Sequence, residues 1–317
     1  VSGGEVQAAL DAGFPADKIV FAGVGKADWE INLGLDNDIF CFNVESAVEL
    51  EIINELAAAK NKVASIALRI NPEVDAHTHA KITTGMKENK FGINLSQLGG
   101  VLDKLKEMKH VKLIGIHSHI GSQITDMSSF RNLVIRFNEI QEELEAHGVT
   151  VENLNFGGGL GIDYYHPNHL SIPAFDNYFA AIHKLLQVRP GQQVHFEPGR
   201  SIVAQCGTLI SKVLYVKEGE TKKFAILDAG FTELIRPAMY DAYHRIENIS
   251  SDEAVETYDV VGPICESSDV FGKDVELNKA HRGDLIALRS AGAYGEVMAS
   301  QYNCRHLPKA YYSDTIK

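Results

Sequence analysis

The sequence has little that would suit a disulfide-stabilised, membrane-spanning or nucleic-acid-binding protein. It holds four cysteines in 317 residues and no CxxC pair, and a chain this long needs no disulfide framework. Acidic residues outnumber basic ones, 42 to 30, and the net charge of −12 argues against nucleic acid, whose phosphates need a basic face. No apolar run is long enough to span a membrane, and no signal-peptide pattern is present. These absences favour a protein of the reducing cytoplasm.

The chain also lacks an initiator methionine, since it begins Val1-Ser2-Gly3-Gly4. This start predicts that the sequence is a fragment of a longer protein. Hydrophobic residues make up 45% and charged residues 23%, which is the composition of a soluble globular protein. The length exceeds one ordinary core, so two domains are expected.

The first two hundred residues alternate strand-like apolar runs with amphipathic helical runs. Ser46 and Glu49 have capping-box spacing ahead of one helical run, and Phe130 to Leu144 follow one helical face. Strands alternating with helices predict a parallel sheet, either open or closed into a barrel. Six strands are expected: Ile19–Ala22, Ile39–Val44, Ile66–Ile70, Leu113–Ile120, Leu154–Phe156 and Val194–Glu197.

A closed barrel needs eight strands, so one strand and most of a second would lie before Val1. After about Ser201 the helical periodicity weakens and short strands separated by turns follow, which predicts a mostly antiparallel β-sandwich or barrel. The prediction is therefore an α/β chain: a partial (β/α)8 TIM-type barrel over residues 1–203, then a β domain over residues 204–317.

Two groups of residues close predicted barrel strands. In Gly157-Gly158-Gly159-Leu160-Gly161, backbone N–H groups could approach a phosphate. A tight turn without a ligand would have the same glycine-rich sequence. His117 and His119 point to one face of their strand, because strand side chains alternate. They could ligate a metal, fill the core as polar residues, or place one imidazole on a flat cofactor ring with Ser122 holding a phosphate. A metal would need further ligands on later strand ends, and none is evident, so no metal site is predicted.

Two further segments carry reactive or charged side chains. Glu197 and Arg200 end the last strand of the alternating region, where Glu197 could pair with a protonated pyridine nitrogen or simply with Arg200. Cys265 lies beside Glu266, and nearby negative charge makes a thiol keep its proton, which suits a proton donor. The alternative is an ordinary loop thiol.

Aromatic and guanidinium groups complete the candidates. Tyr294 lies among small residues, so a ligand could reach its hydroxyl, although a packed turn tyrosine is the alternative. Arg236 and Tyr240 could recognise a carboxylate through the planar guanidinium, or the arginine could be an ordinary surface residue.

Taken in order, these segments resemble the fold-type III pyridoxal-phosphate decarboxylases, which include the ornithine, arginine and diaminopimelate branches. The resemblance runs from Val1 to about Pro308. Each motif is weak alone, whereas the ordered set is specific, and CESSD with RPAMY looks most like the diaminopimelate branch. The motifs are VSGGE, FNVES, LRINP, NKFGI, HSHIGSQ, GGGLG, EPGR, DAG, RPAMY, GPICESSD, GAYG and YN.

The resemblance implies a role for each matching residue. Cys265 would be the proton donor and His119 would stack on the pyridine ring, so both count as catalytic. The implied cofactor contacts are His119, Ser122, Gly157, Gly158, Gly159, Glu197, Gly199, Arg200 and Tyr294. The implied substrate contacts are Arg200, Arg236, Tyr240, Glu266 and Tyr294.

The implied reaction is the decarboxylation of meso-2,6-diaminopimelate to L-lysine and CO2, the last step of lysine biosynthesis. An acid at the pyridine nitrogen keeps the cofactor a strong electron sink, and a two-headed substrate needs the extra Arg, Tyr and Glu groups. The alternatives are carboxynorspermidine or another basic amino-acid decarboxylase, a non-catalytic pyridoxal-phosphate-fold binding protein, and a metal-dependent barrel hydrolase.

One departure from the family concerns the lysine that forms a Schiff base with pyridoxal 5′-phosphate. The family carries it in a Y-A-x-K-A-N-type segment on the first barrel strand, and no lysine here has that context. Lys26 follows Gly-Val-Gly, Lys90 lies in NKFGI and Lys273 follows Phe-Gly. This agrees with a missing first strand. The resemblance also implies a head-to-tail homodimer, because the Cys-Glu loop reaches the partner subunit's site.

Overall fold

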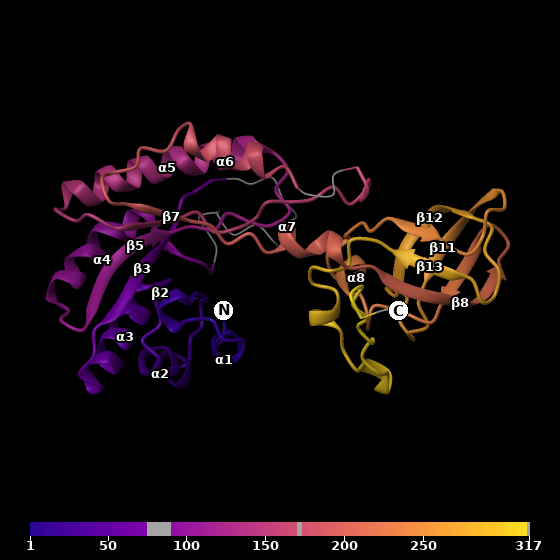
Figure 1. The fold of residues 1–317 in the computed structure, drawn as a ribbon, viewed down its shortest axis with the longest axis horizontal. Helices are drawn as coiled ribbons and strands as arrows, with labels where there is room; N and C mark the ends of the chain where they lie inside the picture. Colours follow the sequence, from indigo (N-terminus) through magenta and orange to yellow (C-terminus); the bar gives the residue numbers. More distant parts are fainter. Residues whose placement is uncertain (75–89, 170–172, 316–317) are drawn as a thin grey trace. The chain divides into compact units, whose positions relative to one another are not determined.

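A computed structural model of the chain describes residues 1–74, 90–169 and 173–315. Two compact units are present (Figure 1): the first comprises Val1–Leu160 with Asp176–Pro198, and the second Gly161–Phe175 with Gly199–Lys317. Each unit is described by itself. The division into residues 1–203 and 204–317 assumed a single break in the chain and stays a prediction; the structure groups Gly161–Phe175 with the second unit.

The first unit contains a parallel sheet, as the alternating pattern predicted. All six expected strands are present in the expected order, and every pairing among them is parallel. The short β4 (Ile93–Asn94), which pairs with β3, was not predicted. The path across the sheet is β1 (Val20–Phe21), β2 (Cys41–Val44), β3 (Ala64–Asn71), β5 (Val111–His117), β6 (Asn153–Asn155) and β7 (Gln193–His195).

Helices cover the outer side of this sheet (Figure 1). Ser46 caps α3 by accepting the Glu49 N–H at 3.1 Å, but the Glu49 carboxylate accepts from the Glu45 N–H instead of returning to Ser46. Among the described residues, no helix is both long and apolar enough to cross a membrane. The helices are α1 (Gly3–Asp11), α2 (Asp28–Asp36), α3 (Ala47–Ala59), α4 (Leu95–Glu107), α5 (Met127–Ala146) and α6 (Phe175–His183).

The core of the first unit lies between the sheet and these helices. The apolar face predicted for Phe130 to Leu144 is buried on α5. Phe137 stacks on Phe156, with ring centroids 4.1 Å apart, and Phe130 meets the Tyr178 ring edge-on at 4.7 Å. Phe156 directly precedes the glycine run, so its packing in the core fixes where that run begins.

The second unit is built on a six-stranded sheet that is mostly antiparallel, as predicted. One pairing, β9 with β11, is parallel. The terminal strands β10 and β12 contact each other, so the sheet curls into a nearly closed barrel. The sequence pattern predicts strands at Leu209–Val216, Lys223–Leu227, Tyr258–Val261 and Leu285–Leu288, so β10 and β12 were not predicted. The sheet order is β10 (Ile246–Asn248), β13 (Leu285–Leu288), β8 (Leu209–Glu218), β9 (Lys223–Leu227), β11 (Val255–Val261) and β12 (Val270–Asn278).

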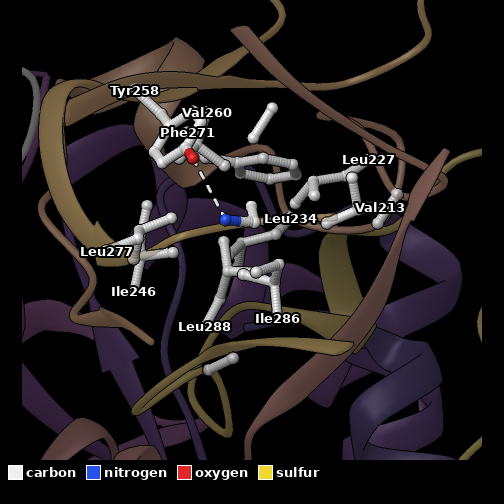
Figure 2. Packing of buried hydrophobic residues seen from close by; sticks show 14 residues of the cluster. Val213, Leu227, Leu234, Ile246, Tyr258, Val260, Phe271, Leu277, Ile286 and Leu288 are labelled. Carbon is white, nitrogen blue, oxygen red and sulfur yellow. Dashed lines mark hydrogen bonds between the residues drawn. The ribbon is translucent and has the colours of Figure 1, made fainter. Parts of the chain in front are cut away.

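The inside of this barrel is filled by aliphatic and aromatic side chains (Figure 2). Tyr258 is almost fully buried, and its hydroxyl accepts the Ala280 N–H at 3.0 Å, so the polar atom is satisfied inside an apolar core. Short helices and turns lie around the barrel: α7 (Arg200–Val203), α8 (Arg236–Tyr240), η2 (Ala204–Cys206), η3 (Glu296–Met298) and η4 (Tyr302–Cys304). The remaining short turn, η1 (Ala16–Lys18), belongs to the first unit.

Candidate active site

Two histidines lie at the C-terminal end of β5. His117 ends the strand with its ring buried, and its Nε2 lies 3.5 Å from the Glu197 carboxylate without hydrogen-bond geometry. His119 accepts the Gly158 N–H at its Nδ1, at 3.1 Å. Burial, and next the positive charge of Arg69, lower the pKa of His119 to about 4, so the ring is neutral at pH 7.

The glycine run packs directly against the ends of the neighbouring strands. A Cβ on Gly157 would lie 2.4 Å from the Ser118 carbonyl oxygen, and one on Gly158 would lie 2.2 Å from the Glu197 carbonyl oxygen. Gly157 also has a φ of +65°, in the left-handed region. Only glycine fits such close backbone contacts. His119, Gly158 and Glu197 therefore lie side by side.

The hydrogen bonds of this run differ from the simple phosphate cradle that was expected. The Gly157 N–H donates to Asn155 Oδ1 at 2.9 Å, and the Gly158 N–H donates to the His119 ring. These two amides are directed at protein acceptors, because the side chains of β5 and β6 stand within reach. The Gly159 amide takes no part in either bond.

Glu197 follows β7 and holds an ionised carboxylate. The Asn155 amide donates to its Oε1 at 2.9 Å, and the side chain is 36% exposed. Burial alone would raise the pKa of Glu197, but the nearby His117 and the Asn155 hydrogen bond outweigh it and lower this pKa to about 2. Asn155 is an uncharged donor, so it orients the carboxylate without neutralising it.

Ser122 lies in the turn after His119. Two residues further on, the Ile124 N–H donates to the Gly159 carbonyl at 2.8 Å, and Ile124 forms an isolated parallel bridge with Leu160. The turn that carries Ser122 is thereby joined to the glycine run.

The metal hypothesis for His117 and His119 gains no support. Within residues 1–74, 90–169 and 173–315, no group of three or more His, Cys, Asp or Glu side chains is arranged to hold a metal ion. The Nδ1 atom of His119 is engaged with a backbone N–H, which a metal would have to displace.

Several motifs of the first unit meet in one buried ion pair for which no role was predicted. Arg69 of LRINP donates to Glu45 of FNVES at 2.8 Å. The same carboxylate accepts the Gly23 N–H at 3.2 Å and the Gly92 N–H, from NKFGI, at 3.1 Å. Both charges are compensated inside the protein, so this cluster holds loops together rather than offering charge to a ligand.

Lys26 is fully engaged in the same way. Its ammonium is buried and donates to the Gly23 carbonyl at 2.8 Å, the Asn43 carbonyl at 2.7 Å and the Glu49 carboxylate at 2.5 Å. An ammonium has three donors, and all three are used. Lys26 is therefore a structural residue in this arrangement.

In the second unit, two buried arginines lie around Tyr164. Arg236, the first residue of α8, donates to His244 Nε2 at 2.7 Å, and its guanidinium lies 4.9 Å from the centre of the Tyr164 ring. Arg200 donates to the Tyr164 hydroxyl at 2.7 Å. His244 Nδ1 lies 2.8 Å from the Arg289 carbonyl. Both arginines, His244 and Tyr164 are at most 6% exposed.

Tyr294 extends this cluster. The Arg200 guanidinium lies 5.0 Å from the centre of its ring, and a Cβ on Gly199 would lie 3.7 Å from its hydroxyl, an ordinary contact distance. Tyr294 itself has a φ of +59° and is partly exposed. Tyr240 ends α8 and is half-buried. Gly199, Arg200 and Tyr294 are thus brought together within the second unit.

The predicted proton donor lies on an exposed loop. Cys265 is a free, exposed thiol, and Glu266 beside it is also exposed. The Tyr302 hydroxyl donates to Glu266 Oε1 at 2.9 Å. This contact orients the Glu266 carboxylate and leaves its charge in place, since a phenol is uncharged at neutral pH.

A buried carboxylate holds that loop. Asp269 accepts the backbone N–H groups of Ile264 and Phe231, each at 2.7 Å. Added Cβ atoms on Gly230 and Gly262 would lie 2.8 Å and 2.2 Å from Asp269 Oδ2, so glycine is required on both sides of the carboxylate. Burial raises the pKa of Asp269, and these backbone donors oppose the shift.

Sequence reasoning missed four residues that hold the predicted ones: Asn155, Tyr164, His244 and Asp269. Asp269 stood inside the quoted CESSD motif, and Asn155 directly preceded Phe156 and the glycine run. Both positions offered a signal. Tyr164 and His244 lay outside the quoted motifs, and their importance rests on contacts with residues distant in sequence.

Comparison with a family model gives a match to "Pyridoxal-dependent decarboxylase, pyridoxal binding domain" over residues 1–204. The diaminopimelate decarboxylase of Bacteroides thetaiotaomicron is 68% identical over 316 residues, which span 100% of this chain and 82% of that protein. The diaminopimelate decarboxylase of Haemophilus influenzae is 45% identical, over 96% of this chain and 73% of that protein.

Solved structures of diaminopimelate decarboxylases are also similar to this chain. Diaminopimelate decarboxylase from Helicobacter pylori, in complex with L-lysine, superposes with a TM-score of 0.89 at 42% identity, covering 96% of this chain and 75% of that one. The Methanocaldococcus jannaschii enzyme in complex with L-lysine gives 0.87 at 41% identity, covering 96% and 71%. An arginine decarboxylase from a Chlorella virus, at 21% identity and a TM-score of 0.83, shares the fold.

Proposed function

Because this chain belongs to the diaminopimelate decarboxylases, a family of pyridoxal-dependent decarboxylases, we propose that it converts meso-2,6-diaminopimelate to L-lysine and CO2. The relatives at 68% and 45% identity bear that name, and two solved relatives hold L-lysine, the product of the proposed reaction. The observation that carries the proposal is the strand-end cluster of ionised Glu197, neutral His119 and the glycine run.

The residues present fit pyridoxal 5′-phosphate. Gly157 and Gly158 carry no side chain, because a Cβ on either would clash with neighbouring backbone, so no side chain of these residues would stand between their backbone and a flat ring or a phosphate. The Glu197 carboxylate suits a protonated pyridine nitrogen, and the neutral His119 ring offers a flat face without adding positive charge. Ser122, Gly159, Gly199 and Tyr294 are the proposed phosphate contacts. Gly157 and Gly158 are proposed to shape the cradle, because their amides donate within the protein.

When bound, the cofactor takes up the electron pair that remains on the reacting carbon after CO2 leaves. Glu197 would stabilise a proton on the ring nitrogen, because its own pKa is about 2, so its carboxylate stays ionised, and because Asn155 holds that carboxylate in place. Cys265 is proposed to donate its thiol proton to the reacting carbon. A positioned general acid of this kind typically contributes about 10² to 10⁴ in rate.

A diaminopimelate molecule has two amino-acid ends, one that reacts and one that must be held. Arg200, Arg236, Tyr240 and Tyr294 are proposed to contact substrate carboxylates, and Glu266 to contact the distal ammonium. The charges of the two arginines and of Glu266 are opposite to those of the groups they would bind, and the uncharged tyrosine hydroxyls can donate hydrogen bonds to a carboxylate. Guanidinium forks and a carboxylate together distinguish this substrate from one with a plain hydrocarbon tail.

The proposal extends to assembly and location. A head-to-tail homodimer would bring Cys265 and Glu266 of one subunit to the site of the other, and the Schiff-base lysine is proposed to lie outside the sequence given. The four cysteines are free, which suits the reducing cytoplasm proposed for the protein.

The experiment is a substrate panel scored by CO2 release from the cofactor-loaded protein: meso-diaminopimelate, carboxynorspermidine, ornithine, arginine and lysine. The proposal expects release from meso-diaminopimelate alone, with L-lysine as product. Preference for carboxynorspermidine or another basic amino acid would replace the substrate assignment. A protein that binds the cofactor and releases CO2 from none of them would be a binding protein and not this enzyme.

A further inference from the structure

We propose that His244 is a positioning residue for carboxylate recognition: as an uncharged acceptor it fixes the Arg236 guanidinium and leaves its positive charge for the substrate. The inference rests on the proposed function for the substrate's chemistry, an amino acid whose distal carboxylate meets Arg236. It adds a residue to that site and a reason for the residue's type.

The geometry fixes both ends of the imidazole. Arg236 Nη1 lies 2.7 Å from His244 Nε2, and His244 Nδ1 lies 2.8 Å from the Arg289 carbonyl oxygen. A carbonyl can only accept, so Nδ1 carries the proton and Nε2 presents its lone pair to the guanidinium. The Tyr164 ring meets the imidazole edge-on, with centroids 5.2 Å apart, and also lies against the Arg236 guanidinium.

The imidazole stays uncharged in this setting. Burial, and then the positive charges of Arg236 and Arg200, lower the pKa of His244 to about 4, against the hydrogen bond to the Arg289 carbonyl. At neutral pH the pair therefore carries one positive charge, which belongs to the guanidinium. A carboxylate in the place of His244 would orient Arg236 equally well but would leave no net charge.

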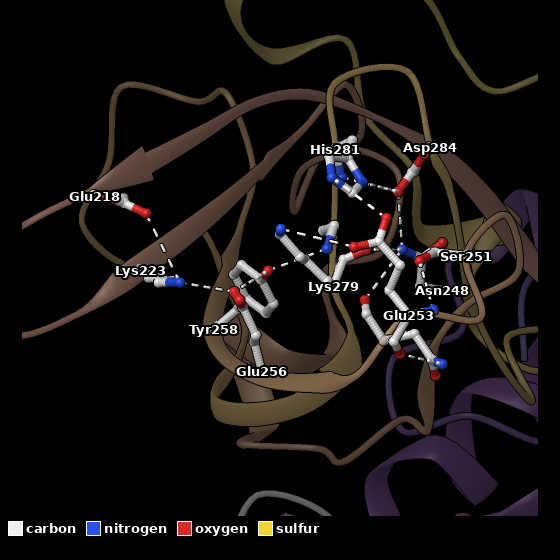
Figure 3. Close-up of polar contacts among 12 residues, drawn as sticks. Glu218, Lys223, Asn248, Ser251, Glu253, Glu256, Tyr258, Lys279, His281 and Asp284 are labelled. Atoms are coloured by element: carbon white, nitrogen blue, oxygen red, sulfur yellow. Dashed lines mark hydrogen bonds and ion pairs between the residues drawn. The ribbon is translucent and has the colours of Figure 1, made fainter.

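Several other cations among the described residues have carboxylate partners. Buried Arg69 and Lys26 have carboxylate partners at 2.8 Å and 2.5 Å. On the surface of the second unit, Lys223 pairs with Glu256 at 2.7 Å and Lys279 with Glu253 at 3.7 Å (Figure 3). Within the described part of the chain, no carboxylate oxygen lies within 4.0 Å of the Arg236 nitrogens, although that side chain is only 5% exposed.

A buried charge without a counter-charge is costly to the folded protein, and an arriving carboxylate relieves that cost. The guanidinium is also held in place before the ligand arrives, so little side-chain entropy is lost on binding. Both effects act on a ligand with a carboxylate and are absent for the same carbon chain without one. His244 should therefore affect affinity for the carboxylate and leave the amines unaffected.

The test compares two ligands on the cofactor-loaded protein by isothermal titration calorimetry at pH 7.5. L-Lysine carries the carboxylate, and 1,5-diaminopentane has the same chain and amines without it. The variants are His244→Gln, which keeps an uncharged acceptor; His244→Ala, which removes it; and His244→Glu, which adds a counter-charge. His281→Gln is the control, since His281 is an exposed histidine of the same unit close to carboxylates (Figure 3).

The inference expects the preference for L-lysine over 1,5-diaminopentane to fall about 10- to 100-fold in His244→Ala, as for loss of a hydrogen bond to a charged group. His244→Glu should lower it at least as far, whereas His244→Gln should stay within about threefold of wild type. His281→Gln should not change it. Should the glutamate variant fail to fold, the Gln and Ala variants decide the matter.

An unchanged preference in His244→Ala, or equal weakening of both ligands, would overturn the inference. So would a wild-type protein that binds L-lysine no better than 1,5-diaminopentane. CO2 release from meso-diaminopimelate is measured alongside. If the wild type releases CO2 and His244→Ala keeps the preference for L-lysine, the His244 role is rejected and the proposed function stands. If His244→Ala loses the preference but the wild type releases no CO2, the His244 role stands and the proposed function is rejected.

Discussion

The two units hold functional charges of opposite sign in the same manner. In the first unit, the Glu197 carboxylate receives its hydrogen bond from the uncharged amide of Asn155. In the second unit, the Arg236 guanidinium donates to the uncharged imidazole of His244. Each charge receives a hydrogen bond from, or donates one to, an uncharged partner, although the Glu197 carboxylate also lies 3.5 Å from His117 Nε2. We propose that both charges stay available to a ligand. The first unit presents a negative charge and the second a positive one.

Charged side chains that only hold the fold together have partners of opposite charge instead. Buried Lys26 and Arg69 are matched by Glu49 and Glu45, and these pairs have no charge left to offer. Burial alone therefore does not mark a site in this chain. The chemical nature of the hydrogen-bond partner separates a charge that holds the fold from a charge reserved for a ligand.

The largest effect is expected from the second unit's loop. Cys265→Ala should lower kcat for meso-diaminopimelate about 10³-fold, since a positioned proton donor is worth about 10² to 10⁴. The cofactor should remain bound, as its absorbance would show. Cys206→Ala, at another exposed free thiol of the same unit, is the control. Unchanged turnover in Cys265→Ala would remove the donor role.

Next in size is the reserved charge of the first unit. Glu197→Gln keeps the shape and loses the charge, so kcat should fall about 10²-fold, as for other lost electrostatic contacts in active sites. Glu49→Gln disturbs a structural pair instead, and its effect should appear in thermal stability and not in kcat. If both substitutions changed kcat equally, the distinction between reserved and structural charges would fail.

A smaller effect is expected for Glu266, which is proposed to contact only the distal end of the substrate. Glu266→Ala should raise KM for meso-diaminopimelate about tenfold, the loss of one hydrogen bond to a charged group, with cofactor affinity unchanged. Tyr302→Phe removes the hydroxyl that orients Glu266 and should act in the same direction, more weakly. Equal loss of cofactor and substrate affinity would refute the substrate role of Glu266.

The strand order of the first unit and the antiparallel character of the second were predictable because hydrophobic periodicity reports local burial. β4 was missed because it has two residues, and β10 because it has three. β12 carries alternating charges on exposed positions, which hides its pattern. Short or mostly exposed strands depend on pairing with neighbours far along the chain.

For the site, the sequence indicated candidate ligand-facing residues, which stay predictions, and missed the residues that hold them in place. Glu197 and Arg236 stood in motifs with recognisable chemistry. The sequence pattern indicated an ordinary strand residue at Asn155 and a polar residue outside the motifs at His244. Their roles depend on hydrogen bonds of 2.9 Å and 2.7 Å to residues 42 and 8 positions away, which composition and spacing do not encode.

The smallest effect concerns pH and stability. The pKa of His244 falls from 6.5 in the unfolded chain to about 4 in the folded one, so the unfolded state binds more protons between these values. The free energy of unfolding should therefore fall as the pH drops from about 6.5 to 4, by about 1 kcal/mol per pH unit for this histidine. Denaturant titrations at several pH values should show that the free energy of unfolding depends less steeply on pH in His244→Gln than in the wild type. The same dependence on pH in both proteins would mean that His244 is not held neutral.

The most direct test of the account is the protonation of the cofactor's ring nitrogen. It can be read from the 15N chemical shift of pyridoxal phosphate labelled at that nitrogen and bound to the protein at pH 7.5. The account predicts a protonated pyridine shift in the wild type and an unprotonated shift in Glu197→Gln. An unprotonated nitrogen in the wild type, or the same shift in both proteins, would contradict the role given to the Glu197 carboxylate.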